Sequence, residues 1–249
     1  MIYFIGAGPG AADLITVRGA ELLKEADVII YAGSLVNPQL LDYAKEDCEI
    51  FNSAHMTLEE VIQVMEKNPD KLVVRLHTGD PCIYGAIREQ MDILDEKEME
   101  YEYVPGVSSF IGAASALKAE YTLPDVSQTV ILTRMAGRTP VPEKEEISKL
   151  AAHGATMVVF LTSTMLEELQ ERLMEGGYAP DSPAAIVYRA TWPDEKVIRT
   201  TVNNIAKAAA DNGINKMALI MVGGFLGDRY DRSKLYDPGF THLFREASK

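Results

Sequence analysis

The sequence is poor in several residue types and patterns, and each shortage excludes a class of protein. Only two of its 249 residues are cysteines, and their spacing fits neither a disulfide framework nor a zinc site, so we expect reduced thiols. The four histidines stand apart and form no ligand pair at helical spacing, so we expect no protein-bound metal. No apolar run is long enough to cross a bilayer, and residues 1–5 are typical of a strand, not of a signal peptide. We therefore expect no membrane partner.

Positive charge is also scarce. Lysine and arginine number 24 against 37 acidic residues, which gives a formal net charge of −13. Nucleic-acid binding depends on clustered lysine and arginine, so we expect no nucleic-acid partner. The acidity is typical of a protein kept in solution in the cytoplasm, where we expect this chain to work. Hydrophobic residues make up 47% of the chain, enough for one large core or two compact ones.

Short β-branched runs alternate with amphipathic stretches, a pattern typical of α/β proteins. In the first half we expect strands at residues 2–5, 28–31, 49–51, 72–77 and 101–104, and helices at 16–26, 57–67, 83–97 and 107–117. Thr57 and Glu60 have the spacing of a capping box, which marks the start of one helix. The periodicity breaks at residues 119–125, where Pro124 disfavours helix. This break predicts two domains, residues 1–120 and 121–249.

The second half continues the alternation of strands and helices. We expect strands at residues 129–133, 156–161, 184–188, 197–201 and 217–222, and helices at 143–152, 164–175 and 203–212. Thr164 with Glu167 predicts another capping box, and Gly176 with Gly177 predicts a helix end. The connection between the third and fourth of these strands is too short for a crossover helix, so that pair should be antiparallel. The second domain should therefore contain a mixed sheet.

A glycine-rich loop, Gly-Ala-Gly-Pro-Gly-Ala at residues 6–11, follows the first expected strand and precedes a helix. It satisfies a degenerate dinucleotide fingerprint, which would suggest a nicotinamide-dependent oxidoreductase. However, Pro9 lacks an amide donor for a pyrophosphate, and the second strand has its acid, Asp27, at its start and none at its end. The loop could also be a tight turn that needs glycine. We prefer a third interpretation, in which it borders a large flat ligand.

A second candidate segment, Thr-Gly-Asp-Pro at residues 78–81, ends the most apolar strand of the first half. Ligands of open α/β sheets bind beyond the carboxyl ends of strands, so Asp80 could bind ribose hydroxyls or face a cationic ligand. Alternatively, Asp80 forms an Asx turn that caps a helix beginning near Ile83, the commoner role of an Asp-Pro turn. Gly79 and Gly85 favour a binding site, because glycine permits close backbone approach.

A third segment, Pro-Gly-Val-Ser-Ser at residues 105–109, ends the following strand. Its serines, Ser108 and Ser109, have two interpretations that the local sequence leaves open. They could cap the start of a helix. Their hydroxyl and amide groups could instead face an adenosine or carboxylate ligand beside Asp80.

Two arginines and a glutamate, Arg134, Arg138 and Glu143, surround a loop that two prolines stiffen. Guanidinium groups pair with carboxylates in a bidentate way, so a fixed loop of this kind would suit a polycarboxylate ligand. A solvated surface loop explains the same residues. A second rigid corner contains Trp192, the only tryptophan, which we expect to serve in packing.

These motifs resemble the tetrapyrrole (corrin and porphyrin) methyltransferases, which use S-adenosylmethionine. In the first half the resemblance is carried by residues 6–10, 13–16, 26–29, 79–81 and 105–109. In the second half, residues 129–134, 138–143, 188–195 and 232–237 resemble the branch that methylates carbon 11 of precorrin-4, or of its cobalt form, on the route to cobalamin. The resemblance implies two α/β domains, the first with a mainly parallel sheet and the second with a mixed sheet. It also implies an active site in the cleft between the domains, a tetrapyrrole substrate, S-adenosylhomocysteine as product, and a homodimer.

The resemblance also assigns site residues. The expected donor contacts are Thr78, Gly79, Asp80, Ile83, Ser108, Ser109, Leu161, Thr162, Ala190 and Ala218. For the substrate, the resemblance places the glycine-rich loop, with Gly8 and Pro9, beside the tetrapyrrole. We also expect Arg134 and Arg138 to bind the carboxylates of the substrate, with Glu143 beside them. Many family members carry an acid at the position of Gly33, and any role of that acid cannot be transferred to this chain.

The catalytic group stays unassigned, and the sequence leaves other functions open. Asp80, Glu143 and His55 are candidates for proton transfer, and none is preferred. Because the chain is acidic and the implied ligand carries many carboxylates, we expect a local basic rim, formed by Arg75, Arg88, Arg134, Arg138 and Arg189. Within the family, another precorrin or uroporphyrinogen III could be the acceptor. Outside it, the alternatives are the oxidoreductase and a non-catalytic tetrapyrrole- or nucleotide-binding module.

Overall fold

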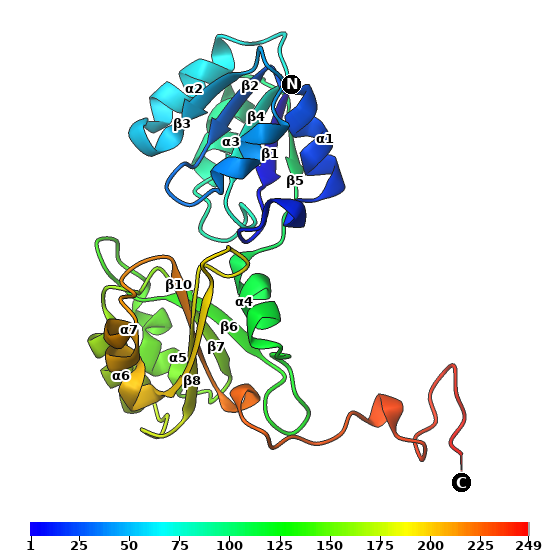
Figure 1. Cartoon of the computed structure of the whole chain (residues 1–249), viewed down its shortest axis with the longest axis vertical. Helices are drawn as coiled ribbons and strands as arrows, with labels where there is room; N and C mark the ends of the chain where they lie inside the picture. The colour runs from blue at the N-terminus through cyan, green and yellow to red at the C-terminus, as the bar shows by residue number, and fades with distance from the viewer. Residues whose placement is uncertain (249) are drawn as a thin grey trace. The chain divides into compact units, whose positions relative to one another are not determined.

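The chain forms two compact units (Figure 1). The computed structural model describes residues 1–248. Unit 1 comprises Met1–Ala113 and Arg189–Glu195, and unit 2 comprises the remainder. The chain passes from the first unit to the second within α4 (Ser109–Leu117), before the boundary expected at residue 120. The segment Arg189–Glu195 joins two strands of unit 2, yet it packs with unit 1.

Unit 1 is built on a parallel sheet with the strand order β3-β2-β4-β1-β5. Its strands are β1 (Ile2–Gly6), β2 (Val28–Tyr31), β3 (Glu49–Asn52), β4 (Val73–His77) and β5 (Tyr101–Val104). Its helices are α1 (Val17–Glu25), α2 (Leu58–Glu66) and α3 (Arg88–Glu96), with shorter 3-10 turns η1 (Ala12–Leu14), η2 (Pro38–Tyr43) and η3 (Ser53–His55). Alternate residues of the strands point to opposite faces of the sheet and form two hydrophobic cores. One core is packed against α1 and η2, and the other is packed against α2 and α3. Because both faces are covered, the central strands are almost entirely apolar.

The start of α2 shows how the sequence specifies a local element. Thr57 Oγ1 accepts a hydrogen bond from the Glu60 amide, and the Glu60 carboxylate accepts one from the Thr57 amide at 2.8 Å. The expected capping box is therefore confirmed. It satisfies amide groups that have no partner within the helix.

Replacing Thr57 with alanine is expected to lower the free energy of unfolding by about 1 kcal/mol, because one helix-capping hydrogen bond is lost. Urea unfolding followed by circular dichroism measures the change. Thr164→Ala is the matched control, since Thr164 makes no capping bond in the structure. Equal effects of the two substitutions would contradict the assignment of the cap.

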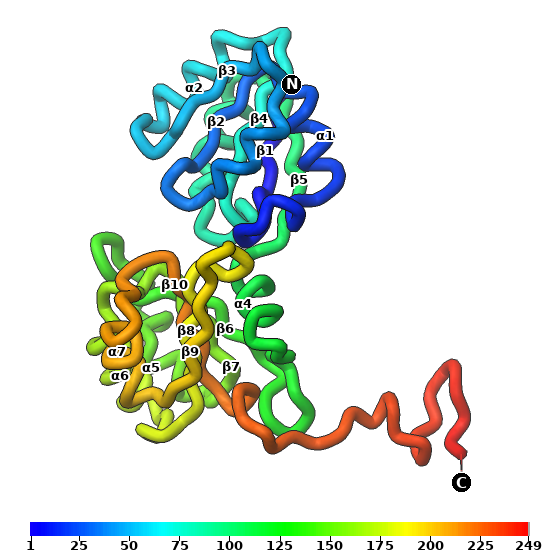
Figure 2. The backbone as a smooth tube through the Cα atoms, in the orientation of Figure 1, coloured from blue at the N-terminus to red at the C-terminus, as the bar shows by residue number. Residues whose placement is uncertain are grey.

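Unit 2 contains a mixed sheet, as expected, and its strand order is β6-β7-β10-β8-β9. Its strands are β6 (Val130–Arg134), β7 (Thr156–Phe160), β8 (Pro183–Tyr188), β9 (Lys196–Thr201) and β10 (Ala218–Val222). Its helices are α5 (Ile147–Ala151), α6 (Leu166–Glu175) and α7 (Ile205–Asp211), with 3-10 turns η4 (Glu143–Glu145), η5 (Val202–Asn204), η6 (Gly224–Leu226) and η7 (Lys234–Tyr236). Only β6 and β7 pair in parallel, and the expected antiparallel pair β8–β9 is confirmed. Figure 2 traces the same path, with the three helices packed over one face of the sheet.

Several helices start later than expected. The helix expected from residue 143 starts at Ile147, after the 3-10 turn η4, and two others are delayed for a visible local reason. The helix expected from residue 83 begins only at Arg88, because Tyr84 and Ala86 adopt left-handed backbone angles that no α-helix contains. The capping box expected at Thr164 is absent, and Met165 occupies the cap position instead. There the Met165 amide bonds to the Thr162 carbonyl in a turn that delays the helix. None of the helices within residues 1–248 is long and apolar enough to span a membrane.

Candidate functional site

Three backbone turns follow the carboxyl ends of the adjacent strands β4, β1 and β5, and in unit 1 they touch. The Gly8 amide donates to the Gly79 carbonyl at 3.2 Å, and the Gly79 amide donates to the Gly8 carbonyl at 2.8 Å. Gly6 and Gly106 approach so closely that a Cβ atom on Gly6 would lie 2.5 Å from the Gly106 Cα atom. Ligands of parallel sheets bind beyond this edge, so the contact of the three turns, here called the turn junction, is the candidate site.

Asp80 ties two of these turns together. Its Oδ1 atom accepts hydrogen bonds from the Cys82 amide at 2.9 Å and from the Tyr103 hydroxyl, and its Oδ2 atom accepts one from the Gly106 amide at 2.8 Å. Burial by itself raises the pKa of Asp80, but these hydrogen bonds outweigh it and lower the pKa below its usual value. The Asx turn at Cys82 is present, and the carboxylate also fixes the β4 turn to the β5 turn.

The donor contacts expected in the first 113 residues gather at the turn junction but differ in exposure. Thr78, Ile83 and Ser109 are partly exposed, whereas Gly79 and Ser108 are buried. Gly79 has a φ of +60°, which favours glycine. The Ser108 carbonyl accepts the first amide hydrogen bonds of α4, so this serine stands at the helix start. The junction therefore leaves two hydroxyl side chains and one apolar side chain accessible.

The segment Arg189–Glu195 packs against the glycine-rich loop within unit 1. The Ala11 amide donates to Thr191 Oγ1 at 3.0 Å. A Cβ atom on Gly10 would collide with the Trp192 ring and would lie 2.7 Å from the Ala190 carbonyl oxygen. Trp192 therefore has the packing role expected of it, and the expected donor contact Ala190 is a buried residue beside the loop.

The expected substrate residues of the glycine-rich loop, Gly8 and Pro9, are both buried. Gly8 has a φ of +81°, and Pro9 packs against Gly112 of α4. The buried side chain of Asn37 donates to the Gly10 carbonyl at 2.8 Å and holds the loop from its other side. These contacts explain why the turn needs glycine, and its role beside a ligand stays a prediction.

In unit 2 the structure brings three of the expected site residues, Arg134, Arg138 and Leu161, to one pocket of about 370 Å³. Leu161 is 62% exposed and has a left-handed φ of +53°. The pocket is lined by Arg134, Met135, Gly137, Arg138, Thr139, Leu161, Thr164 and Met165. It combines guanidinium groups with apolar side chains.

The other expected residues of unit 2 do not line this pocket. Thr162 is fully buried, and its hydroxyl donates to the Phe160 carbonyl at 2.6 Å and accepts from the Met135 amide at 3.3 Å. Ala218 is buried in β10. Glu143 is exposed and pairs with Lys149 at 3.0 Å. Any contact of Thr162 or Ala218 with a ligand would have to use backbone atoms or the alanine methyl group.

The expectation of a rim of five arginines is wrong for Arg75, which is only 6% exposed within β4. Arg88 and Arg189 each pair with an aspartate of their own segment. Arg134 donates to three backbone carbonyls of its own loop and thereby stiffens it. Arg138 is exposed and makes no hydrogen bond or ion pair within residues 1–248, so its charge is open to a ligand.

The candidates for proton transfer are dispersed. Of Asp80, Glu143 and His55, only Asp80 lies at the turn junction, and both of its oxygens already accept hydrogen bonds. Tyr103, which no sequence motif pointed to, donates its hydroxyl hydrogen to Asp80, and burial and this hydrogen bond raise the pKa of Tyr103. Residues 1–248 contain no group of three or more His, Cys, Asp or Glu residues that could hold a metal, and both cysteines are free thiols.

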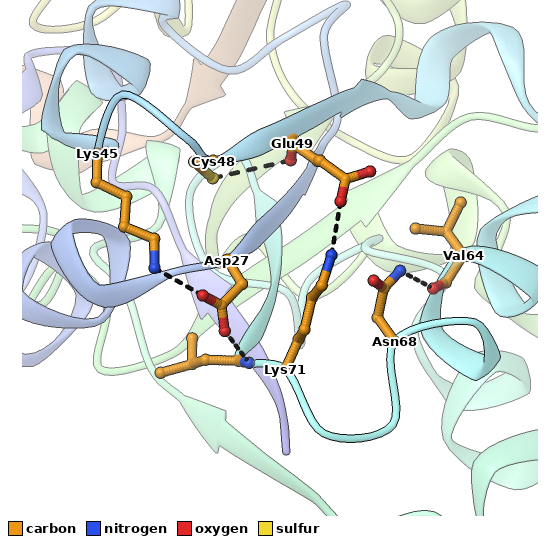
Figure 3. Close-up of polar contacts among 8 residues, drawn as sticks. Asp27, Lys45, Cys48, Glu49, Val64, Asn68 and Lys71 are labelled. Carbon is orange, nitrogen blue, oxygen red and sulfur yellow. Dashed lines mark hydrogen bonds and ion pairs between the residues drawn. The ribbon is translucent and has the colours of Figure 1, made fainter.

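The oxidoreductase interpretation needs an acid at the carboxyl end of β2, and Asp27 precedes β2 at the opposite end. The Asp27 carboxylate pairs with Lys45 at 2.6 Å and accepts a hydrogen bond from the Leu72 amide at 2.8 Å (Figure 3). The hydrogen bond from Lys45 is the main cause of a lowered Asp27 pKa. Beside it, Lys71 pairs with Glu49 at 2.6 Å. Asp27 therefore joins the amino ends of neighbouring strands and cannot bind a ribose beyond their carboxyl ends.

Comparison with known proteins gives one consistent result. Residues 1–206 match the family Tetrapyrrole (Corrin/Porphyrin) Methylases. A protein of Methanocaldococcus jannaschii named cobalt-precorrin-4 C(11)-methyltransferase is 53% identical over 251 residues, which cover 100% of this chain and 97% of the relative. A protein of the same name from Priestia megaterium is 48% identical and covers 100% of this chain and 98% of the relative.

A solved structure shows the same fold. It is an X-ray structure described as a cobalamin biosynthetic enzyme, cobalt precorrin-4 methyltransferase. It superposes with a TM-score of 0.89 at 48% sequence identity and covers 91% of this chain and 96% of that chain. The expected fold class is confirmed: the chain has two α/β units, the first with a parallel sheet and the second with a mixed sheet.

Proposed function

The chain belongs to the tetrapyrrole (corrin/porphyrin) methylase family, and from that premise we propose that it methylates carbon 11 of cobalt-precorrin-4. The methyl donor is S-adenosylmethionine, and the products are cobalt-precorrin-5 and S-adenosylhomocysteine. The observation that carries the proposal is the 53% identity, along the full chain, to a relative named for this reaction. The enzyme works in the cytoplasm, as its acidic composition indicates, and it forms a homodimer, as the sequence resemblance implies.

The accessible groups of the turn junction suit this donor. Thr78 and Ser109 offer hydroxyls for its polar parts, and Ile83 offers an apolar contact, while Asp80 holds the turns that carry them. When bound, S-adenosylmethionine supplies a methyl group that its sulfonium makes electrophilic. Transfer of this group needs alignment more than a strong base, so the main task of the chain is to place the two reactants. Donor contacts with Leu161, Thr162, Ala190 and Ala218 are part of the proposal and are supported by the sequence resemblance.

Arg138 is the side chain best suited to bind an acceptor carboxylate. Arg138→Ala is expected to raise the KM for the tetrapyrrole about tenfold, as loss of one charge-assisted contact does, with little change in kcat. Steady-state kinetics at two salt concentrations measure the effect, because screening weakens such a contact. Lys207→Ala, which removes an exposed cation on α7, is the control. An unchanged KM for Arg138→Ala would reject this role.

The decisive experiment supplies methyl-labelled donor and several acceptors. We expect label transfer to cobalt-precorrin-4, with a product heavier by one CH₂ unit and substituted at carbon 11. Metal-free precorrin-4 tests whether cobalt is required, and faster transfer to uroporphyrinogen III would support the alternative acceptor within the family. Calorimetry should show binding of S-adenosylhomocysteine and none of nicotinamide cofactors. Binding without any label transfer would favour a non-catalytic binding module.

A further inference from the structure

One positive charge lies inside unit 1 without a carboxylate partner. Arg75 is 6% exposed, and none of the ion pairs within residues 1–248 includes it. Its guanidinium donates to the Gln90 side-chain oxygen at 3.1 Å and to the Ile30 carbonyl at 3.2 Å. Burial lowers the pKa of Arg75 to about 10, so the group still carries its charge at neutral pH. A buried charge is costly unless its hydrogen bonds are met, so this arrangement needs an explanation.

Gln90 links Arg75 by hydrogen bonds to the segment that precedes α3. It is 5% exposed in the first turn of α3, and both ends of its side-chain amide are engaged. The oxygen accepts from Arg75 Nε, and the nitrogen donates to the Ala86 carbonyl at 2.9 Å. If the Gln90 amide were flipped, its NH₂ group would face the Arg75 guanidinium and its oxygen would face the Ala86 carbonyl, and neither hydrogen bond could form. The guanidinium therefore fixes the orientation of the amide.

The segment that Gln90 contacts, residues 81–87, has an unfavourable backbone. Tyr84 and Ala86 have left-handed φ angles of 56° and 49°, which are unfavourable for residues other than glycine. Between them, a Cβ atom on Gly85 would collide with the Pro81 carbonyl. A conformation of this kind persists only where its surroundings hold it. The same segment follows Asp80 directly and carries Ile83, an expected donor contact.

We infer that Arg75 and Gln90 act together as positioning residues, which hold residues 81–87 in the one conformation that binds the methyl donor. The inference rests on the proposed function, because it takes Ile83 as part of the donor site. Gln90 joins α3 to β4 through Arg75, and with its other end it reaches a strained segment next to the turn junction. Loss of the contact with Ala86 alone, with the Arg75 contact kept, would therefore change donor binding more than global stability.

Gln90→Glu tests this separation. The carboxylate keeps and strengthens the contact with Arg75, whereas its second oxygen faces the Ala86 carbonyl with no proton to donate. We expect the thermal midpoint to be unchanged. Calorimetry should show an affinity for S-adenosylhomocysteine that is about tenfold weaker, because residues 81–87 would hold the binding conformation in only about a tenth of the molecules. Amide hydrogen exchange should rise in residues 81–87 and not elsewhere in unit 1. Gln63→Glu, the same change at an exposed position of α2, is the matched control.

The outcomes separate this inference from the proposed function. Wild-type protein that does not bind S-adenosylhomocysteine would overturn both. Binding by the wild type and equal binding by Gln90→Glu would overturn the positioning role alone. Weaker binding together with a lower thermal midpoint and faster exchange throughout unit 1 would assign the pair to stability and also reject it. The double variant Gln90→Glu with Ala86→Gly should recover part of the affinity, because glycine adopts this φ without strain.

Discussion

Replacing Asp80 with alanine is expected to lower the free energy of unfolding by about 3 kcal/mol and to weaken S-adenosylhomocysteine binding by at least about tenfold. The carboxylate accepts hydrogen bonds from Cys82, Tyr103 and Gly106, so its loss releases the β4 turn from the β5 turn and leaves the donors unpaired. Thermal unfolding should show a fall of roughly 10 °C for a protein of this size. Calorimetry on the folded variant measures the affinity.

The pH dependence of stability provides a second measure of the same contact. The folded-state pKa of Asp80 is lowered, so its contribution is fully present above the unfolded pKa of about 3.9 and is lost as the pH falls through the folded-state value. The stability difference between wild type and Asp80→Asn should therefore shrink below about pH 4. A difference that grows on acidification, or an Asp80→Ala variant with wild-type affinity, would contradict the role of this carboxylate.

Gly106→Ala is expected to have the other large effect, a loss of about 4 kcal/mol in unfolding free energy and of measurable donor binding. A Cβ atom there would collide with the Gly79 carbonyl and lie 2.7 Å from the Gly6 Cα atom. These are backbone atoms of adjacent strand ends, so neither can give way without opening the turn junction. Urea unfolding and calorimetry with S-adenosylhomocysteine provide the measurements.

A matched glycine separates this steric effect from backbone strain. Gly154 has a φ of +60° and open space around its Cβ position, so Gly154→Ala should cost only the left-handed penalty of about 1 kcal/mol. Donor binding should be unchanged by that substitution. If Gly106→Ala proved no more damaging than Gly154→Ala, the close approach of the turns would have no energetic importance.

The strands could be predicted because their signal is local. The central strands of unit 1, β1, β2 and β4, are buried on both faces and appear in the sequence as short, mostly apolar runs. The short connection after β8 predicted the antiparallel β9. Residues 83–87 could not be predicted in this way. Their left-handed angles depend on contacts such as that of Gln90 with Ala86, which no helical periodicity reveals.

The turns of the candidate site could be predicted, but the bonds between them could not. Asp80 was identified from its place at a strand end, whereas its partners Tyr103 and Gly106 lie 23 and 26 residues further along the chain. The burial of Arg75, unlike these bonds, has a signal in the local sequence. A charged residue within an otherwise apolar parallel strand is buried with its neighbours, so it belongs to the interior and not to a surface rim.

The packing of Arg189–Glu195 against the glycine-rich loop has a consequence for biosynthesis. A ribosome makes residues 1–113 early, but the piece that covers Gly10 emerges only after most of the polypeptide has been made. The amino-terminal unit must therefore wait, with one of its turns uncovered, until residues 189–195 have been made. A fragment that ends at residue 120 would lack this piece permanently.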